Sequence, residues 1–215
     1  PEKEWNSPSP EGLSRILQTF VSKNTHCFVE NLFSFKGVEP TYARTIIDGL
    51  TESVKSGQNI DWPKTIAYVT WIIGQPRETG KEKSTISGSD PHWGWARKIC
   101  ARLLSTGLEK NKIPISQKDT IWQIIETITE DPDPFPENDE LTSMDPATES
   151  INTVRGEAMH AVVRYALWVR ESVSVESGTK SDEGNFSMDY IPEVRKCLEK
   201  HLDSTIDSSP AIRAI

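Results

Sequence analysis

The chain has 215 residues, of which 35% are hydrophobic and 26% are charged, a composition typical of a folded protein with an apolar core. No apolar run approaches the roughly 20 residues that a membrane-spanning helix needs. The formal net charge of -8 argues against nucleic acid or an anionic membrane as the main partner, because both bind positively charged surfaces. We therefore expect no nucleic acid and no membrane among its partners.

The three cysteines, Cys27, Cys100 and Cys197, are odd in number and far apart in the sequence. Each lies among apolar residues in a helical pattern, where a free thiol packs as a small buried hydrophobe. Such usage is typical of a reducing compartment rather than of a disulfide framework, and it predicts a cytoplasmic protein.

Apolar residues recur at helical spacing along the chain, and a helix-start signal precedes most of these stretches. Ser9 and Pro10, for example, place a capping residue and a proline at the first helical position. Similar patterns predict further helices that begin near residues 28, 40, 62, 91, 116, 146 and 192, the one at 146 being long. Because no run alternates with period two and no hairpin turn stands out, we expect an all-α fold with three long polar loops, at residues 77–89, 131–145 and 171–189.

The helix starts resemble one another at fixed intervals. Arg44, Arg97, Arg155 and Arg213 each follow a proline start and an apolar residue, and their spacings are 53, 58 and 58 residues. Self-similarity of this kind is typical of an α-solenoid. We therefore predict a single helical-repeat domain over residues 1–215, with antiparallel helix pairs stacked as an α-α superhelix. The predicted repeats span 9–37, 38–89, 90–144 and 145–206, followed by a truncated repeat from 207.

The last predicted repeat stops within its first helical turn, at Ile215. A natural terminus rarely stops there, because a single turn has nothing to continue into. We therefore expect the chain to be a fragment of a longer polypeptide, whose open C-terminal end allows self-association.

The stretches 154–158 and 207–213 resemble the Asp…Val-Arg-x-x-Ala step of HEAT repeats. In that family an Asp pairs with an Arg of the adjoining repeat, in a ladder along the solenoid. Asp207 and Arg213 have the family spacing. The spacing is one residue longer from Asp90 to Arg97 and much longer from Asp145 to Arg155, so the pattern does not predict a regular ladder. The stretch 145–170 also resembles interior segments of large, largely uncharacterised bacterial proteins, which implies helical repeats without an activity.

Glu157 and His160 are three residues apart, a spacing that puts both on one helix face and that di-iron helical bundles use. Such a site needs a second Glu-x-x-His pair, and no other histidine has a glutamate three residues before it. A polar pair on the helix surface is therefore the favoured interpretation, which makes Glu157 and His160 part of a candidate interaction surface, and we predict no metal and no cofactor.

His92 and Trp93 follow Asp90 and Pro91 at a predicted helix start, and Trp95 is close behind. Tryptophan is enriched in binding hot spots, so this cluster is a candidate interaction surface. The alternative is that the tryptophans pack between helix pairs, with His92 partly exposed, and the helical spacing favours this alternative.

No nucleophile elbow, phosphate-binding loop or dinucleotide fingerprint occurs in the sequence. We therefore predict a non-catalytic scaffold or protein-interaction segment of a larger bacterial protein, which binds either other parts of its own chain or another protein. Two alternatives stay open. The chain could be the sensing or regulatory arm of a multidomain NTPase-type protein, or an enzyme with a pocket between helices around Glu157 and His160.

Overall fold

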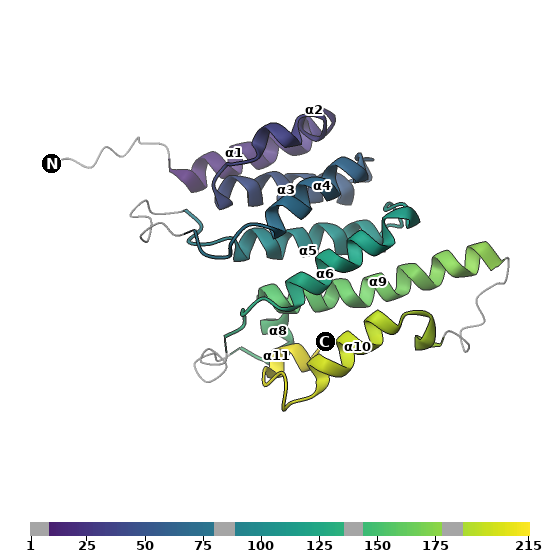
Figure 1. Ribbon diagram of the computed structural model, residues 1–215. Coiled ribbons are helices and arrows are strands. Elements are labelled where there is room, and N and C mark those ends of the chain that lie inside the picture. Colours follow the sequence, from purple (N-terminus) through teal and green to yellow (C-terminus); the bar gives the residue numbers. More distant parts are fainter. Residues whose placement is uncertain (1–8, 80–88, 136–143, 178–186) are drawn as a thin grey trace. The chain divides into compact units, whose positions relative to one another are not determined.

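The computed structural model describes residues 9–79, 89–135, 144–177 and 187–215 (Figure 1). Within these ranges the chain forms helices and no β-strand, and the one extended pairing is an isolated antiparallel bridge between Glu78 and His92. The prediction of an all-α fold is confirmed.

The α-helices and the short 3-10 helices (η) follow one another with short connections in most of the described chain. In order they are α1 (Pro10–Lys23), α2 (Thr25–Glu30), η1 (Leu32–Phe35), α3 (Pro40–Lys55), α4 (Trp62–Ile73), α5 (Gly94–Glu109), η2 (Ile115–Gln117), α6 (Lys118–Thr129), α8 (Pro146–Ser150), α9 (Val154–Ser177), η3 (Met188–Tyr190), α10 (Pro192–Leu202) and α11 (Pro210–Arg213).

Side-chain caps account for several of these starts, as the sequence predicts. Ser9 accepts a hydrogen bond from the backbone N–H of Gly12, and Asp61 accepts one from Lys64. Asp145 does the same for Thr148 at the start of α8. Each cap satisfies a backbone donor that the first helical turn leaves without a partner.

The chain divides into two compact units, an N-terminal unit over Pro1–Leu103 and a C-terminal unit over Leu104–Ile215. The boundary falls inside α5. In the N-terminal unit α1 packs along α3 (Figure 1). The short helix α2 contacts α1, α3 and α4, and η1 contacts α4. Gly49 permits the close approach of α1 to α3, because a Cβ atom at this position would lie 2.6 Å from the Cβ of Val21.

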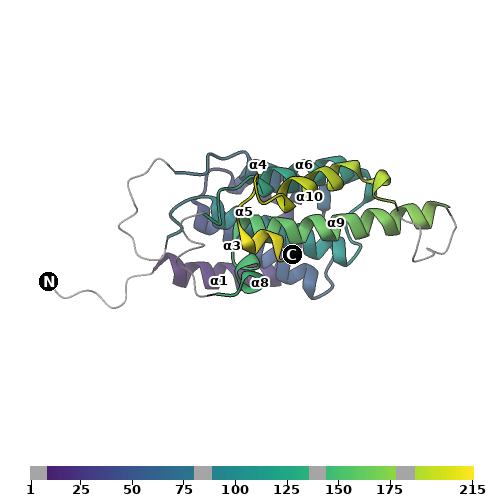
Figure 2. The ribbon, with the colours of Figure 1, turned by 90° about the horizontal axis from the view of Figure 1, so that it is seen from below.

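In the C-terminal unit α6 packs against α9, and α11 packs against α8 and the start of α9. Figure 2 shows the C-terminal end beside α8 and α9. A run of aromatic rings lies along α9, where Tyr165 contacts Trp122 of α6 at 5.2 Å and Trp168 at 5.9 Å between ring centroids. The hydroxyl of Tyr165 donates to Glu193 of α10, which ties α10 to the same core.

The prediction of one long helix from Pro146 is wrong, because the structure divides this stretch into α8 and α9. Two contacts occur at the second start. Asp133 accepts the backbone N–H of Val154 on its carboxylate at 2.8 Å and that of Arg155 on its carbonyl oxygen at 2.9 Å, and the hydroxyl of Thr153 accepts the backbone N–H of Gly156 as a local cap. The prediction of a polar loop from residue 171 is also wrong at its beginning, since α9 continues to Ser177. The central parts of the three predicted loops, residues 80–88, 136–143 and 178–186, lie outside the described residues.

The cysteines are free, and Cys100 and Cys197 are buried as predicted. Cys27 is exposed, so the prediction of a buried thiol there is wrong. It lies on the six-residue helix α2, whose buried side chains are those of Thr25, Phe28 and Val29.

Candidate binding surface

The pair Glu157 and His160 lies near the start of α9, and its geometry differs from that of a surface metal site. Glu157 is buried, and His160 is half-buried with its Nε2 3.4 Å from the hydroxyl of Ser150. In the ranges that the structure describes, no group of three or more histidine, cysteine or acidic side chains could hold a metal ion. Glu157 is therefore unavailable as part of an exposed interaction surface.

The aromatic cluster at the start of α5 presents a different residue to solvent from those singled out in the sequence. Trp93 is buried, with its ring edge-on to Trp71 of α4 at 5.5 Å. His92 is half-buried, and its Nδ1 accepts the backbone N–H of Gly94. Trp95, whose helical spacing indicated a core position, is 48% exposed instead. The exposed aromatic face of this cluster is therefore that of Trp95, and Trp93 cannot be part of it.

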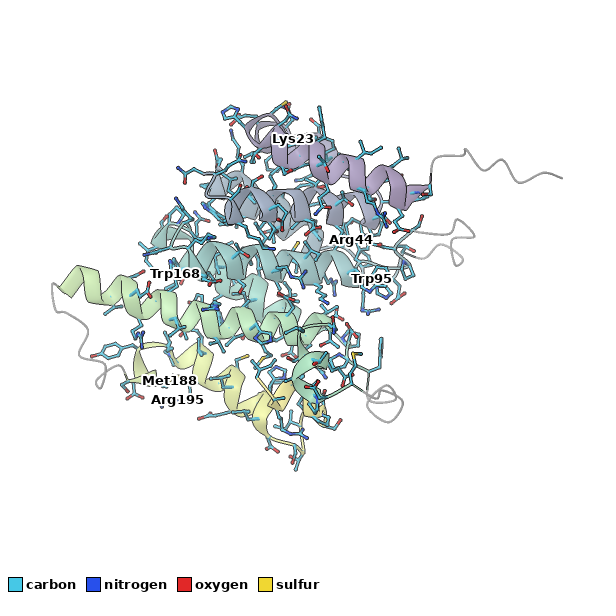
Figure 3. The ribbon with its side chains drawn as sticks, turned by 180° about the vertical axis from the view of Figure 1, so that it is seen from behind. Lys23, Arg44, Trp95, Trp168, Met188 and Arg195 are labelled. Atoms are coloured by element: carbon cyan, nitrogen blue, oxygen red, sulfur yellow. The ribbon has the colours of Figure 1, made fainter. Side chains whose placement is uncertain are left out.

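A cavity of about 430 Å³ opens beside Trp95, between α1, α3 and the start of α5. Figure 3 shows Arg44 of α3 and Trp95 of α5 close to one another. The cavity is lined by charged and polar side chains with Trp95 as its aromatic member: Glu11, Ser14, Arg15, Gln18, Arg44, Thr45, Asp48, Ser89, Asp90 and Trp95.

Two of the acidic groups in this cavity are paired with arginines. Arg44 donates to both carboxylate oxygens of Asp90, at 2.6 Å from Nε and 3.0 Å from Nη2. The Asp90 side chain is only 1% exposed, and its backbone N–H donates to the hydroxyl of Thr41. Glu11 pairs with Arg15 on the exposed side of α1. The two-point pair of Arg44 and Asp90 fixes the geometry of both groups.

Asp48 is the third acidic group in the cavity, and its surroundings differ. Its Oδ2 accepts a hydrogen bond from the amide of Gln18 at 2.6 Å, and within the described chain it forms no ion pair. Burial raises the pKa of the Asp48 carboxyl above its ordinary value, and Glu52, one turn along α3, raises it further. The positive charges of Arg102, Arg44 and Lys55 oppose this shift by lowering the pKa.

The opposite side of α1 carries an apolar ridge, which we define as Leu13, Ile16 and Phe20. These side chains are 43%, 69% and 57% exposed. They follow one another three and four residues apart, so they share one face of the helix. A shallow hollow of about 440 Å³ lies on this face, lined by Arg15, Ile16, Thr19, Phe20 and Lys23.

The arginines at the predicted repeat positions occupy related but unequal environments. Arg44 pairs with Asp90, and Arg155 lies 3.3 Å from Asp207, so in both cases an arginine pairs with the aspartate that precedes a later helix start. Arg97 donates instead to the carbonyl oxygens of Ile73 and Gln75, and Arg213 donates to the carbonyl oxygen of Asp207.

No family model matches the chain, and neither the curated proteins nor the solved structures contain a significant match. In the part of the chain that the structure describes, no helix is both long enough and apolar enough to cross a bilayer. We therefore infer a function from the surfaces of the chain itself.

Proposed function

We propose that this chain is a non-catalytic helical-repeat segment that binds protein through the apolar ridge of α1. The observation that carries the proposal is the exposure of three large apolar side chains on one face of a helix whose other face packs on α3. Exposing such side chains to water is unfavourable by about 25 cal/mol for each Å² of apolar surface. A contiguous apolar ridge on a folded surface is typical of a protein-binding site.

The occupant that fits the ridge is an acidic amphipathic helix. Apolar residues at positions i, i+3 and i+7 present the pattern that a second helix meets when two helices pack side by side. The helix α1 carries the acid Glu11 and the bases Arg15 and Lys23, so it is slightly basic in a chain of net charge -8. Opposite charge at the edges of such an interface steers the encounter and disfavours like-charged partners.

The ion pairs of Arg44 and Arg155 support a repeat architecture in which helix pairs stack on their neighbours. Each pair joins an arginine in the first turns of a helix to an aspartate at the start of a later one, at 2.6 Å and 3.3 Å. This is the kind of pairing that HEAT repeats use. In such arrays a helix pair buries its apolar face by stacking on the next pair, and α1 offers an equivalent face.

The proposal is tested with two synthetic amphipathic helices that share one apolar face and differ only in flanking glutamates or lysines. We expect the glutamate-flanked peptide to bind the full chain, as measured by fluorescence anisotropy, and the lysine-flanked peptide to bind more weakly. The substitution Ile16→Asp should weaken binding by about tenfold or more, which corresponds to about 1.4 kcal/mol, because it places a charge in the apolar contact. Ile16 is preferred to Phe20, whose ring also packs on Phe28.

The matched control is Val163→Asp, which puts the same charge on another exposed apolar position, in α9. This variant should bind the peptide as the parent chain does. Equal binding of both peptides, or no effect of Ile16→Asp, would refute the proposal. A dimer in light scattering that Ile16→Asp dissociates would identify a second copy as the occupant, and so contradict the acidic helix.

A further inference from the structure

We infer that the cavity between α1, α3 and the start of α5 binds an arginine side chain of a partner protein, with Asp48 as its anionic contact and Trp95 as its aromatic contact. The inference rests on the proposed role in protein binding, but it concerns a surface separate from the apolar ridge of α1. An experiment can therefore refute arginine binding in the cavity without refuting helix binding on the ridge, and the reverse also holds.

Among the described residues, Asp48 is the acidic group of the cavity that forms no ion pair. Arg44 is committed to Asp90 through two hydrogen bonds, whereas Arg15 forms a single exposed ion pair with Glu11. Because Asp90 is buried, breaking its pair with Arg44 would leave a buried charge without a partner, which is strongly unfavourable. Arg44 is thus held away from Asp48 although both lie on α3.

Within the described part of the chain, Asp48 accepts a hydrogen bond from the neutral amide of Gln18 alone, on its Oδ2 atom. The Oδ1 atom has lone pairs left for a donor that enters the cavity. The charges that face this carboxylate are Glu52, Arg44 and Lys55 on its own helix and Arg102 on α5. Burial and Glu52 raise the pKa of the carboxyl in spite of these three cations, so a further donor to Oδ1 would favour its ionised form.

Trp95 supplies the second contact. Its side chain lines the same cavity, and it is half-exposed, with the half-buried His92 ring 6.2 Å away in an edge-on arrangement. An indole ring and a carboxylate that line one cavity suit a guanidinium, which can stack on the ring while its N–H groups donate to the acid. The cavity volume of about 430 Å³ is within the range of ligand pockets and accommodates one long side chain.

The test uses Nα-acetyl-arginine methylamide as the probe and its citrulline counterpart, a neutral side chain of nearly the same shape. Binding is followed by NMR through the indole N–H signal of Trp95 in the full chain, assigned with Trp95→Phe. We expect a saturable shift with the arginine probe at neutral pH and none with the citrulline probe. Asp48→Asn should weaken binding about fivefold or more, because it removes the charge and keeps the shape.

The control for a general charge effect is Glu52→Gln, which removes the same charge one turn away on α3 without touching the cavity lining. It should change the affinity by less than about twofold, as expected of an exposed charge. Equal losses in Asp48→Asn and Glu52→Gln, or equal shifts with the citrulline probe, would overturn the inference. Ile16→Asp should leave arginine binding intact, and Asp48→Asn should leave binding of the acidic helix intact, so failure of one proposal is distinguishable from failure of the other.

Discussion

A close backbone contact occurs at Gly156, in the first turn of α9. A Cβ atom at this residue would lie 2.0 Å from the carbonyl oxygen of Ser150, at the end of α8, and 2.7 Å from the hydroxyl of Thr153. The first of these neighbours is backbone and cannot rotate away. Residue 156 must therefore be glycine for α8 and α9 to meet as they do.

We expect Gly156→Ala to lower the free energy of unfolding by about 2–4 kcal/mol, because the added methyl group displaces the backbone between the two helices. The measurement is denaturant unfolding of the full chain followed by circular dichroism. The control is Gly74→Ala, where an added Cβ would meet nothing closer than 3.4 Å and the backbone is already helical. If Gly156→Ala lowers the free energy of unfolding no more than Gly74→Ala does, the close contact at residue 156 is contradicted.

At the scale of elements, Asp207 connects three helices of the C-terminal unit. Its carboxylate accepts from His201 Nδ1 of α10 at 2.8 Å and from the backbone N–H of Ser209 at 3.1 Å. It lies 3.3 Å from Arg155 of α9, and its carbonyl oxygen accepts from Arg213 of α11 at 2.6 Å. Because Asp207 and His201 are both buried, this one carboxylate determines how the ends of α9, α10 and α11 meet.

Replacing Asp207 by alanine should destabilise the full chain by about 3 kcal/mol or more, since it leaves His201 and Arg155 without their buried partner. Thermal unfolding would show this as a lower Tm. Asp189→Ala removes an exposed acid that pairs with Arg195 at the start of α10, and it should leave the Tm nearly unchanged. Similar losses of stability in the two variants would show that Asp207 does not join the helices in solution.

At the scale of the whole molecule, each compact unit contains a buried cysteine. Cys100 of the N-terminal unit is fully buried, and burial raises the pKa of its thiol far above the ordinary value. Cys197 of the C-terminal unit is 6% exposed, and burial raises the pKa of its thiol to about 11. Since the thiolate is the reactive form, both groups are protected at neutral pH as long as their units stay folded.

We expect iodoacetamide to alkylate the exposed Cys27 first, Cys197 much more slowly and Cys100 last, as followed by mass spectrometry of peptides. In denaturant the three cysteines should react at similar rates, which controls for differences in local sequence. Alkylation of Cys100 as fast as that of Cys27 in the native chain would contradict the packing of the N-terminal unit. A series at intermediate denaturant would also reveal whether the two units open together, because each carries its own reporter.

The sequence predicted the helical class and the starts of several helices correctly, since these depend on neighbouring residues. Ser9, Asp61 and Asp145 cap helices through hydrogen bonds that span three residues, and the apolar period is equally local. It predicted wrongly where contacts between distant residues decide the outcome. The start of α9 has a local cap in Thr153, whose hydroxyl accepts the backbone N–H of Gly156, but Val154 also donates to Asp133, about twenty residues upstream, and this second contact leaves no local signal.

The candidate site follows the same division. The sequence alone predicts a helical, acidic chain, and it identifies Arg44, Asp90 and the residues around His92 as candidates. The packing of the helices is needed to show that Trp93 is buried while Trp95 is exposed, and that Asp48 shares a cavity with two arginines that pair with other acids. Helical periodicity places a residue on a face of its own helix, but burial and charge balance are set by the neighbouring helices, which the sequence does not position.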